Sequence, residues 1–158
     1  MTRHIFVSVL ALASLFLAGC KQSDKFKTHA ETWLIHSEGA PNSLNLRLLQ
    51  AAQFIKPDEL LSKDEIARIW AVIDESTGNQ WLATSATQIR ASFNQIGQPP
   101  SEFRDTYADM QQFTRLIEEA VVYEMNHRDD PREVYATVKP MTDRAEQLLA
   151  VIRLRLGK

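Results

Sequence analysis

Apolar residues recur every three or four positions through almost all of this chain, and this spacing constrains the fold more than any other feature. An α-helix has 3.6 residues per turn, so such a spacing places apolar side chains along one helix face. No segment after residue 20 shows the sustained apolar–polar alternation that is typical of a half-buried strand. The pattern therefore predicts an all-α fold, a compact bundle of about five to six helices.

Turn and capping signals divide the chain into six expected helices. Gly39 with Pro41, Pro57, Gly78, and Gly97 with Pro99 and Pro100 mark the interruptions. Ser62 followed by Glu65 forms a capping box, and Asp130-Pro131 offers a cap with a proline at the first helical position. We expect helices at about residues 24–37, 42–56, 63–77, 80–96, 100–127 and from 131 onward.

The last two helices should form the spine of the bundle. Only Arg128, Asp129 and Asp130 separate them, so they are predicted to be antiparallel neighbours. Pro140 lies inside the apolar stripe of the final helix, where it lacks a backbone donor and crowds the preceding turn. We therefore expect a kink or a break near residues 137–139.

The first twenty residues carry a different signal. Arg3 and His4 precede an apolar run from Ile5 to Leu17, which small residues and the only cysteine of the chain then follow. Leu17-Ala18-Gly19-Cys20 resembles the lipobox of bacterial lipoproteins. The resemblance implies cleavage between Gly19 and Cys20, a diacylglycerol on the Cys20 sulfur and an acyl chain on the new amine. The apolar run would form a helix of about 20 Å, which is too short to span a bilayer. The alternative to a lipoprotein signal is therefore an ordinary secretory signal.

The resemblance also implies a domain organisation and a location. Residues 1–19 are the expected signal peptide, residues 20–27 a lipidated tether, and residues 28–158 a single helical domain. Three lipid chains hold a protein on a membrane permanently, whereas one alone binds reversibly. Lys21 after the cysteine implies transfer to the outer membrane, with the domain facing the periplasm. Display on the cell surface stays open as an alternative.

The charge balance argues against a nucleic-acid partner. Removing residues 1–19 takes away Arg3 alone among the charged side chains and leaves 17 Lys and Arg against 20 Asp and Glu. Nucleic-acid binding depends on a concentrated basic surface, which this balance does not supply. A lone cysteine also excludes an internal disulfide, so the domain must rely on its core.

The candidate catalytic and metal-ligating residues do not form a recognisable motif. His29 and His36 lie seven positions apart, farther than the four-residue step of a helical zinc pair, and His127 suits a helix C-terminus. Glu118, Glu119 and Glu124 are expected on a solvated face, since consecutive residues diverge by about 100° around a helix. We expect no enzymatic activity, no metal and no cofactor beyond the covalent lipid.

The expected role is therefore that of a non-catalytic protein-interaction module of the envelope or of a secretion system. Trp81, Gln98 and Ser101 are the candidate partner surface, because Trp81 falls one position outside the inward row and the other two lie in a turn. Expected partners are the membrane, through the lipid, and another envelope protein. A bundle that binds a small molecule or lipid, and a cell-envelope hydrolase, are the alternatives.

Overall fold

Helices account for nearly all of the residues that the structure describes, and no strand occurs among them. The computed structural model describes residues 22–54 and 60–158. Residues 22–37 are helical and are called the N-terminal helix below. After it come α2 (Ala40–Gln53), α3 (Lys63–Thr77), α4 (Asn79–Ile96), a 3₁₀ turn (Ser101–Phe103), α5 (Arg104–Asn126) and α6 (Pro131–Leu156). The predicted all-α bundle is confirmed.

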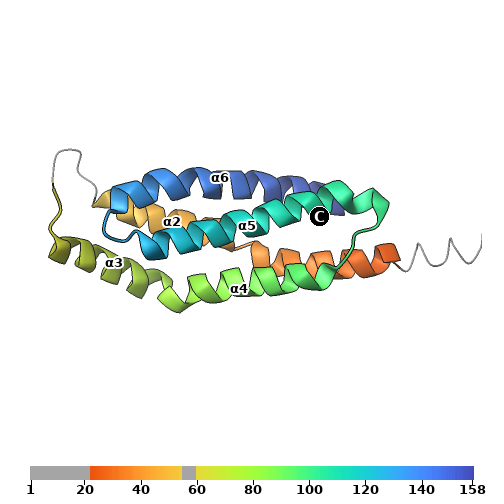
Figure 1. Ribbon diagram of the computed structural model, residues 1–158, viewed down its shortest axis with the longest axis horizontal. Coiled ribbons are helices and arrows are strands. Elements are labelled where there is room, and N and C mark those ends of the chain that lie inside the picture. The colour runs from red at the N-terminus through yellow and green to blue at the C-terminus, as the bar shows by residue number, and fades with distance from the viewer. Residues whose placement is uncertain (1–21, 55–59) are drawn as a thin grey trace, which may run out of the picture.

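The helices run back and forth along one long axis (Figure 1). The N-terminal helix and α2 follow one another in one direction, and α3 and α4 return in the other. Then α5 and α6 complete the bundle as a long antiparallel pair, as the short joint between them predicts. This topology makes two ends. The near end holds the start of the N-terminal helix, the α4–α5 connection and the C-terminus, and the far end holds the end of α2, the start of α3 and the α5–α6 connection.

Glycine at position 78 explains why α3 and α4 are two helices instead of one. Gly78 has φ of 74°, a left-handed conformation that costs side-chain-bearing residues energy. Its amide donates to the carbonyl of Asp74 at 2.9 Å, which closes α3 before α4 begins at Asn79. The resulting change of direction lets α3 sit at the far end while α4 packs along α5.

Both predicted helix starts have the expected caps. The Ser62 hydroxyl accepts from the Glu65 amide at 3.3 Å, and the Glu65 carboxylate accepts from the Ser62 amide at 2.8 Å. At the start of α6, the Asp130 carboxylate accepts from the amides of Arg132 and Glu133, with Pro131 at the first helical position. These short-range signals were readable in the chain because each acts within one helical turn.

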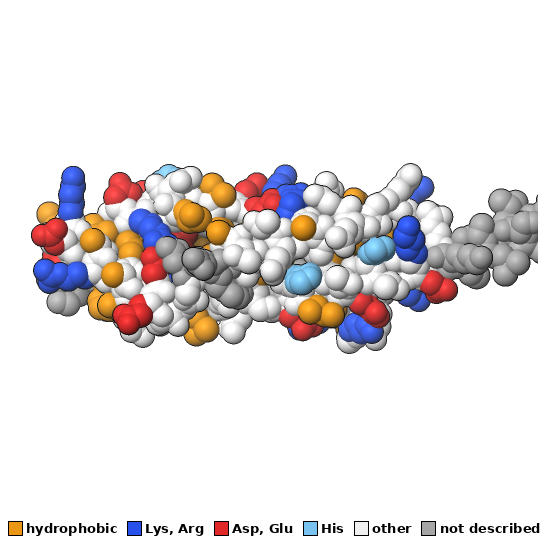
Figure 2. Space-filling view, turned by 90° about the horizontal axis from the view of Figure 1, so that it is seen from below, with side chains coloured by type: hydrophobic (Ala, Val, Ile, Leu, Met, Phe, Trp, Pro, Cys, Tyr) orange, Lys and Arg blue, Asp and Glu red, His pale blue; other side chains and the backbone are white. Residues whose placement is uncertain are grey.

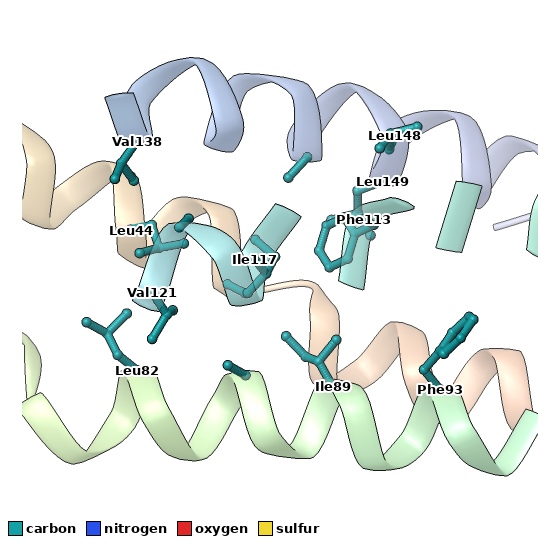
Figure 3. Packing of buried hydrophobic residues seen from close by; sticks show 14 of the residues in the cluster. Leu44, Leu82, Ile89, Phe93, Phe113, Ile117, Val121, Val138, Leu148 and Leu149 are labelled. Atoms are coloured by element: carbon teal, nitrogen blue, oxygen red, sulfur yellow. The ribbon is translucent and has the colours of Figure 1, made fainter. Parts of the chain in front are cut away.

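The core is a continuous seam of apolar side chains between the antiparallel segments (Figure 3). The predicted stripe of α4 is buried along its whole length, at Leu82, Ala86, Ile89, Phe93 and Ile96. It faces Phe113, Ile117 and Val121 of α5, and Val138, Leu148 and Leu149 of α6 close the other side. Each fully buried side chain of this size contributes about 1.5–3 kcal/mol.

The N-terminal helix is part of this core and starts earlier than expected. The helix begins at residue 22, two residues before the expected start at 24, and so overlaps the tether expected at residues 20–27. Phe26 is buried with its ring stacked on Phe103 at 4.6 Å between centroids. Trp33 is also buried, edge-on to Phe113, and its indole donates to the Thr114 hydroxyl at 3.1 Å. The N-terminal helix is therefore packed against the bundle from Phe26 onward, four residues after its first residue.

Two expectations about prolines need correction. Pro140 does not break the last helix, because α6 is continuous from Pro131 to Leu156. Its ring lies on the exposed face, while Val138 and Thr142 on either side are buried and keep the helix on its neighbours. Pro41 was expected to stop a helix, but it lies in the first turn of α2, where a missing amide costs nothing. The expected stop at Pro57 lies outside the described residues.

Candidate functional site

The predicted lipidation and cleavage residues, Cys20 and Gly19, lie outside the described residues. What the structure gives is the position of the helix that follows them. This helix starts at the near end of the bundle, beside the α4–α5 connection. Any attachment at residue 20 therefore acts on the near end and leaves the far end free of it.

The structure does not bring the three candidate partner residues together. Gln98 and Ser101 are exposed in the connection at the near end. Trp81 lies in the first turn of α4, about 25 Å away along the helix axis at 1.5 Å per residue, and its side chain is outside the described part. Gln98 and Ser101 therefore share one connection, whereas the backbone of residue 81 lies at the other end of α4.

The most unusual feature of the described residues is a buried charge cluster formed by Arg47, Asp74, Glu124 and Arg128. Arg47 of α2 and Glu124 of α5 are both 0% exposed. The Arg47 Nε donates to both Glu124 carboxylate oxygens, at 3.0 and 3.2 Å, and its Nη2 donates to Asp74 of α3 at 2.7 Å. One arginine therefore joins three helices.

Arg128 extends the cluster to the α5–α6 connection. Its two Nη atoms donate to the Asp74 carboxylate at 2.7 and 3.2 Å, and Nη2 also reaches Glu124 at 3.3 Å. The Arg128 guanidinium lies 5.2 Å from the centroid of the Trp70 ring, and the Trp70 indole donates to the Arg128 carbonyl at 2.6 Å. The connection is thereby fastened to α3.

This arrangement is suited to holding helices and not to acid–base chemistry. Two arginines balance two carboxylates, and Thr77 accepts a further hydrogen bond from Arg47. A buried ion is tolerated only when its charge is paired and its hydrogen-bonding atoms are satisfied. Because Glu124 and Asp74 are each bound by both arginines, neither carboxylate is placed as a general base.

The electrostatics of Asp74 follow from these contacts. Burial alone would raise the pKa of Asp74, but the hydrogen bonds and charges of Arg128 and Arg47 outweigh burial and hold the pKa below its ordinary value of 3.8. Burial likewise would lower the pKa of Arg47, whereas Glu124 and Asp74 raise it above its ordinary value. Both shifts favour the charged forms, so the cluster is an ionic one at neutral pH.

The prediction that Glu124 lies on a solvated face is wrong. Glu118 and Glu119 are at least partly exposed and pair with Arg90 and Arg115, as a surface face would. Glu124, in contrast, follows Ile117 and Val121 on the inward stripe of α5 at helical steps of four and three. Arg47 lies in the same way between Leu44 and Ala51 on α2. The sequence did contain a signal for this buried ion pair: a charged residue on the inward stripe of one helix and an opposite charge on the inward stripe of another.

The three histidines that the structure describes do not converge on a site. His36 is exposed, His29 is half-buried, and His127 stacks on the Tyr123 ring at 3.9 Å while its Nδ1 contacts the Tyr123 carbonyl at 3.0 Å. Among the residues that the structure describes, no group of three or more His, Cys, Asp or Glu side chains has the arrangement of a metal site.

Hollows gather at the far end of the bundle, around the first turns of α3. One hollow, of about 730 Å³, is lined by Leu61, Lys63, Ile66, Ala67, Trp70, Arg128 and Asp129. A second, about 310 Å³, lies between the end of α2 and the outer face of α3. Figure 2 shows hydrophobic side chains among charged ones at this end of the molecule. Both hollows are open to solvent and lie outside the core seam.

Comparison with known proteins gives no further guide to this site. The chain matches no protein-family model, no curated protein and no solved structure. Within residues 22–54 and 60–158, none of the helices combines the length and the apolar content that crossing a bilayer requires.

Removing one member of the buried charge cluster should destabilise the fold more than removing a pair. Arg47→Met leaves Glu124 buried without its main partner, so we expect a loss of about 3–5 kcal/mol in the free energy of unfolding. Arg47→Met combined with Glu124→Leu should cost clearly less, because no buried carboxylate is stranded. Urea denaturation of both variants measures this.

The exposed pair Arg115–Glu119 is the matched control, with a coupling of at most about 1 kcal/mol. Additive losses in the cluster would contradict a buried ion pair.

The lowered pKa of Asp74 predicts a stability that depends on acid. The carboxylate binds protons more weakly in the folded state, so its contribution is complete above pH 4 and is lost as the pH falls through the folded-state pKa. Unfolding free energies of the wild type and Asp74→Asn should therefore differ most near pH 7 and converge below pH 4. Asp129→Asn, an exposed neighbour, controls for the loss of a carboxylate. A difference that stays constant across this range would rule out the proposed linkage.

Proposed function

We propose that this protein is a lipid-anchored envelope lipoprotein of bacteria that acts as a non-catalytic protein-interaction module on the periplasmic face of the outer membrane. The observation that carries the proposal is Leu17-Ala18-Gly19-Cys20 after a basic start and an apolar run. The function of such an anchor is to hold a folded domain at a fixed place. The proposal therefore concerns what that domain presents and to what.

The fold supports a module that is held by one end. The N-terminal helix is packed into the core from Phe26 onward, so only a few residues separate Cys20 from the rigid bundle. Each residue spans at most about 3.5 Å, which keeps the near end close to the leaflet. The last helix, α6, has 26 residues and a length of about 39 Å, and it gives the bundle its reach.

The side chains of the bundle support binding over catalysis. The buried Glu124 carboxylate and the half-buried Asp74 carboxylate are bound by arginines. Large side chains such as Trp33, Phe113 and Ile117 fill the interior, where a ligand-binding bundle would have a cavity. Exposed Gln98 and Ser101 are the candidate contact for a partner near the membrane. A module of this kind contributes its surface and its location.

Substitution of Cys20 tests the anchor. Cys20→Ala removes the sulfur that would carry diacylglycerol, so we expect a mature protein without lipid-dependent membrane association. Fractionation of the envelope and mass spectrometry of the N-terminus measure the result, with Ser23→Ala as a control substitution close to the same site. An unchanged membrane-bound pool of Cys20→Ala, or a wild-type chain that keeps Met1, would refute the proposal.

Photo-crosslinking tests the interaction. A photoreactive residue at Gln98 or Ser101 should give a discrete adduct with another envelope protein, since both side chains are exposed at the end nearest the anchor. The same residue at Arg144, exposed on α6, is the control and should not give that adduct. Equal labelling of abundant outer-membrane proteins from all three positions would count against an interaction module.

A further inference from the structure

Three exposed residues on the outer face of α3, together with Leu61 just before the helix, line one hollow at the surface. Glu65, Arg68 and Val72 follow each other at steps of three and four, so they share one helix face. Leu61 precedes the extended N-cap Ser62, packs partly against the core and lies beside this face. All four line the hollow of about 310 Å³ beside the end of α2. Glu65 and Arg68 are exposed, and Val72 is 52% exposed. This set is called the α3 stripe below.

The α3 stripe is self-complementary. Read in either direction it is apolar, charged, charged, apolar, and the two charges have opposite sign. The midpoint between Glu65 and Arg68 is also the midpoint between Leu61 and Val72. We propose that the α3 stripe binds a second copy of this chain, with the two α3 helices antiparallel around a twofold axis at that midpoint.

In this arrangement every residue of the stripe meets a suitable partner. Glu65 of each copy faces Arg68 of the other, and Leu61 faces Val72. A parallel arrangement would instead oppose Glu65 to Glu65 and Arg68 to Arg68, which repel. The charge order therefore selects both the occupant and its direction, which a uniformly apolar groove could not do.

The surroundings of the stripe suit such a contact. Arg68 has no hydrogen bond or ion pair with the described residues of its own chain, so its guanidinium is available to a second copy. The capping box holds the Glu65 side chain at the start of α3 and so fixes where its carboxylate lies. Beside the stripe, Phe54 at the end of α2 is 40% exposed, lines the same hollow and enlarges the apolar area.

The geometry has a consequence for the pair as a whole. Because α3 runs along the long axis of the bundle, antiparallel α3 helices direct the two near ends away from each other (Figure 1). The far ends then overlap at the centre of the dimer. The contact itself does not depend on lipidation, so its test is separate from that of the anchor.

Exchange of charges tests the contact in the full chain, purified in detergent. We expect the wild type to sediment as a monomer–dimer mixture that shifts with concentration. Arg68→Glu and Glu65→Arg each place like charges across the axis, and each should weaken dimerisation about tenfold or more. An equimolar mixture of the two variants restores both ion pairs, so it should dimerise again. Helix content by circular dichroism shows that each variant is folded.

A wild type that stays monomeric at all concentrations would overturn the proposal, as would a mixture that does not associate. Arg115→Glu, on the exposed face of α5, is the matched control and should leave dimerisation unchanged.

Cysteine pairs test the direction independently of charge. Within one chain, about 14 Å of helix separates residue 72 from the start of α3 at Lys63, which places residues 61 and 72 too far apart for a disulfide. The double variant Leu61→Cys/Val72→Cys should therefore form a covalent dimer on mild oxidation, while either single variant should not. Dimers from Leu61→Cys alone would contradict the antiparallel register, and absence of a dimer from the double variant would contradict the contact. The unsubstituted chain shows the background from Cys20.

Discussion

The hydrogen bonds of Arg47 fix the positions of α2, α3 and α5 relative to one another. An arginine that is fully removed from water must find acceptors for its guanidinium, and here Glu124 of α5, and Asp74 and Thr77 of α3, supply them. Apolar burial provides most of the free energy that drives these helices together, but it is not directional. The ionic contacts are directional, so they select one register of α2 against α5 and one position of α3.

The position of α3 shows why this matters. Gly78 separates α3 from α4, and the main apolar seam runs along α4, α5 and α6. What remains to hold α3 is a short inward stripe of Ile69, Trp70 and Ile73 together with the ionic contacts of Asp74. The cation–π contact of Arg128 with Trp70 ties the same helix to the α5–α6 connection. At the near end, Phe26 stacks on Phe103, and ion pairs join Arg155 to Asp109 and Lys158 to Glu31.

Sequence reasoning succeeded where a signal acts within one or two helical turns. The caps at Ser62 and Asp130, the inward row of α4 and the antiparallel pairing of α5 with α6 are all of this kind. It failed for Glu124, because the arginine that makes its burial tolerable lies 77 residues away and on another helix. Of the kink or break expected at Pro140, the continuous α6 excludes the break, since packing on both sides of an exposed proline outweighs the local loss of one hydrogen bond.

The candidate sites divide along the same line. The lipobox resemblance at Cys20 can be read from consecutive residues alone. Whether Trp81 lies near Gln98 and Ser101, in contrast, depends on the length and direction of α4, which separates them. The α3 stripe is an intermediate case. Its residue order can be read in the chain, but its meaning depends on learning that α2 leaves this face of α3 open to solvent.

An anchor and a weak self-complementary surface would reinforce each other. Molecules that are confined to one leaflet meet far more often than molecules in solution, because the confinement raises their effective concentration. A contact made of two exposed ion pairs and a few apolar side chains would be weak between free chains, since exposed ion pairs contribute only about 0–1 kcal/mol each. On a membrane the same contact could be sufficient. With the twofold axis perpendicular to the leaflet, both near ends of the antiparallel pair could reach it, and the joined far ends would lie between the two anchors. Anchoring would then set the concentration of the chain, and the charge order of α3 would set its orientation.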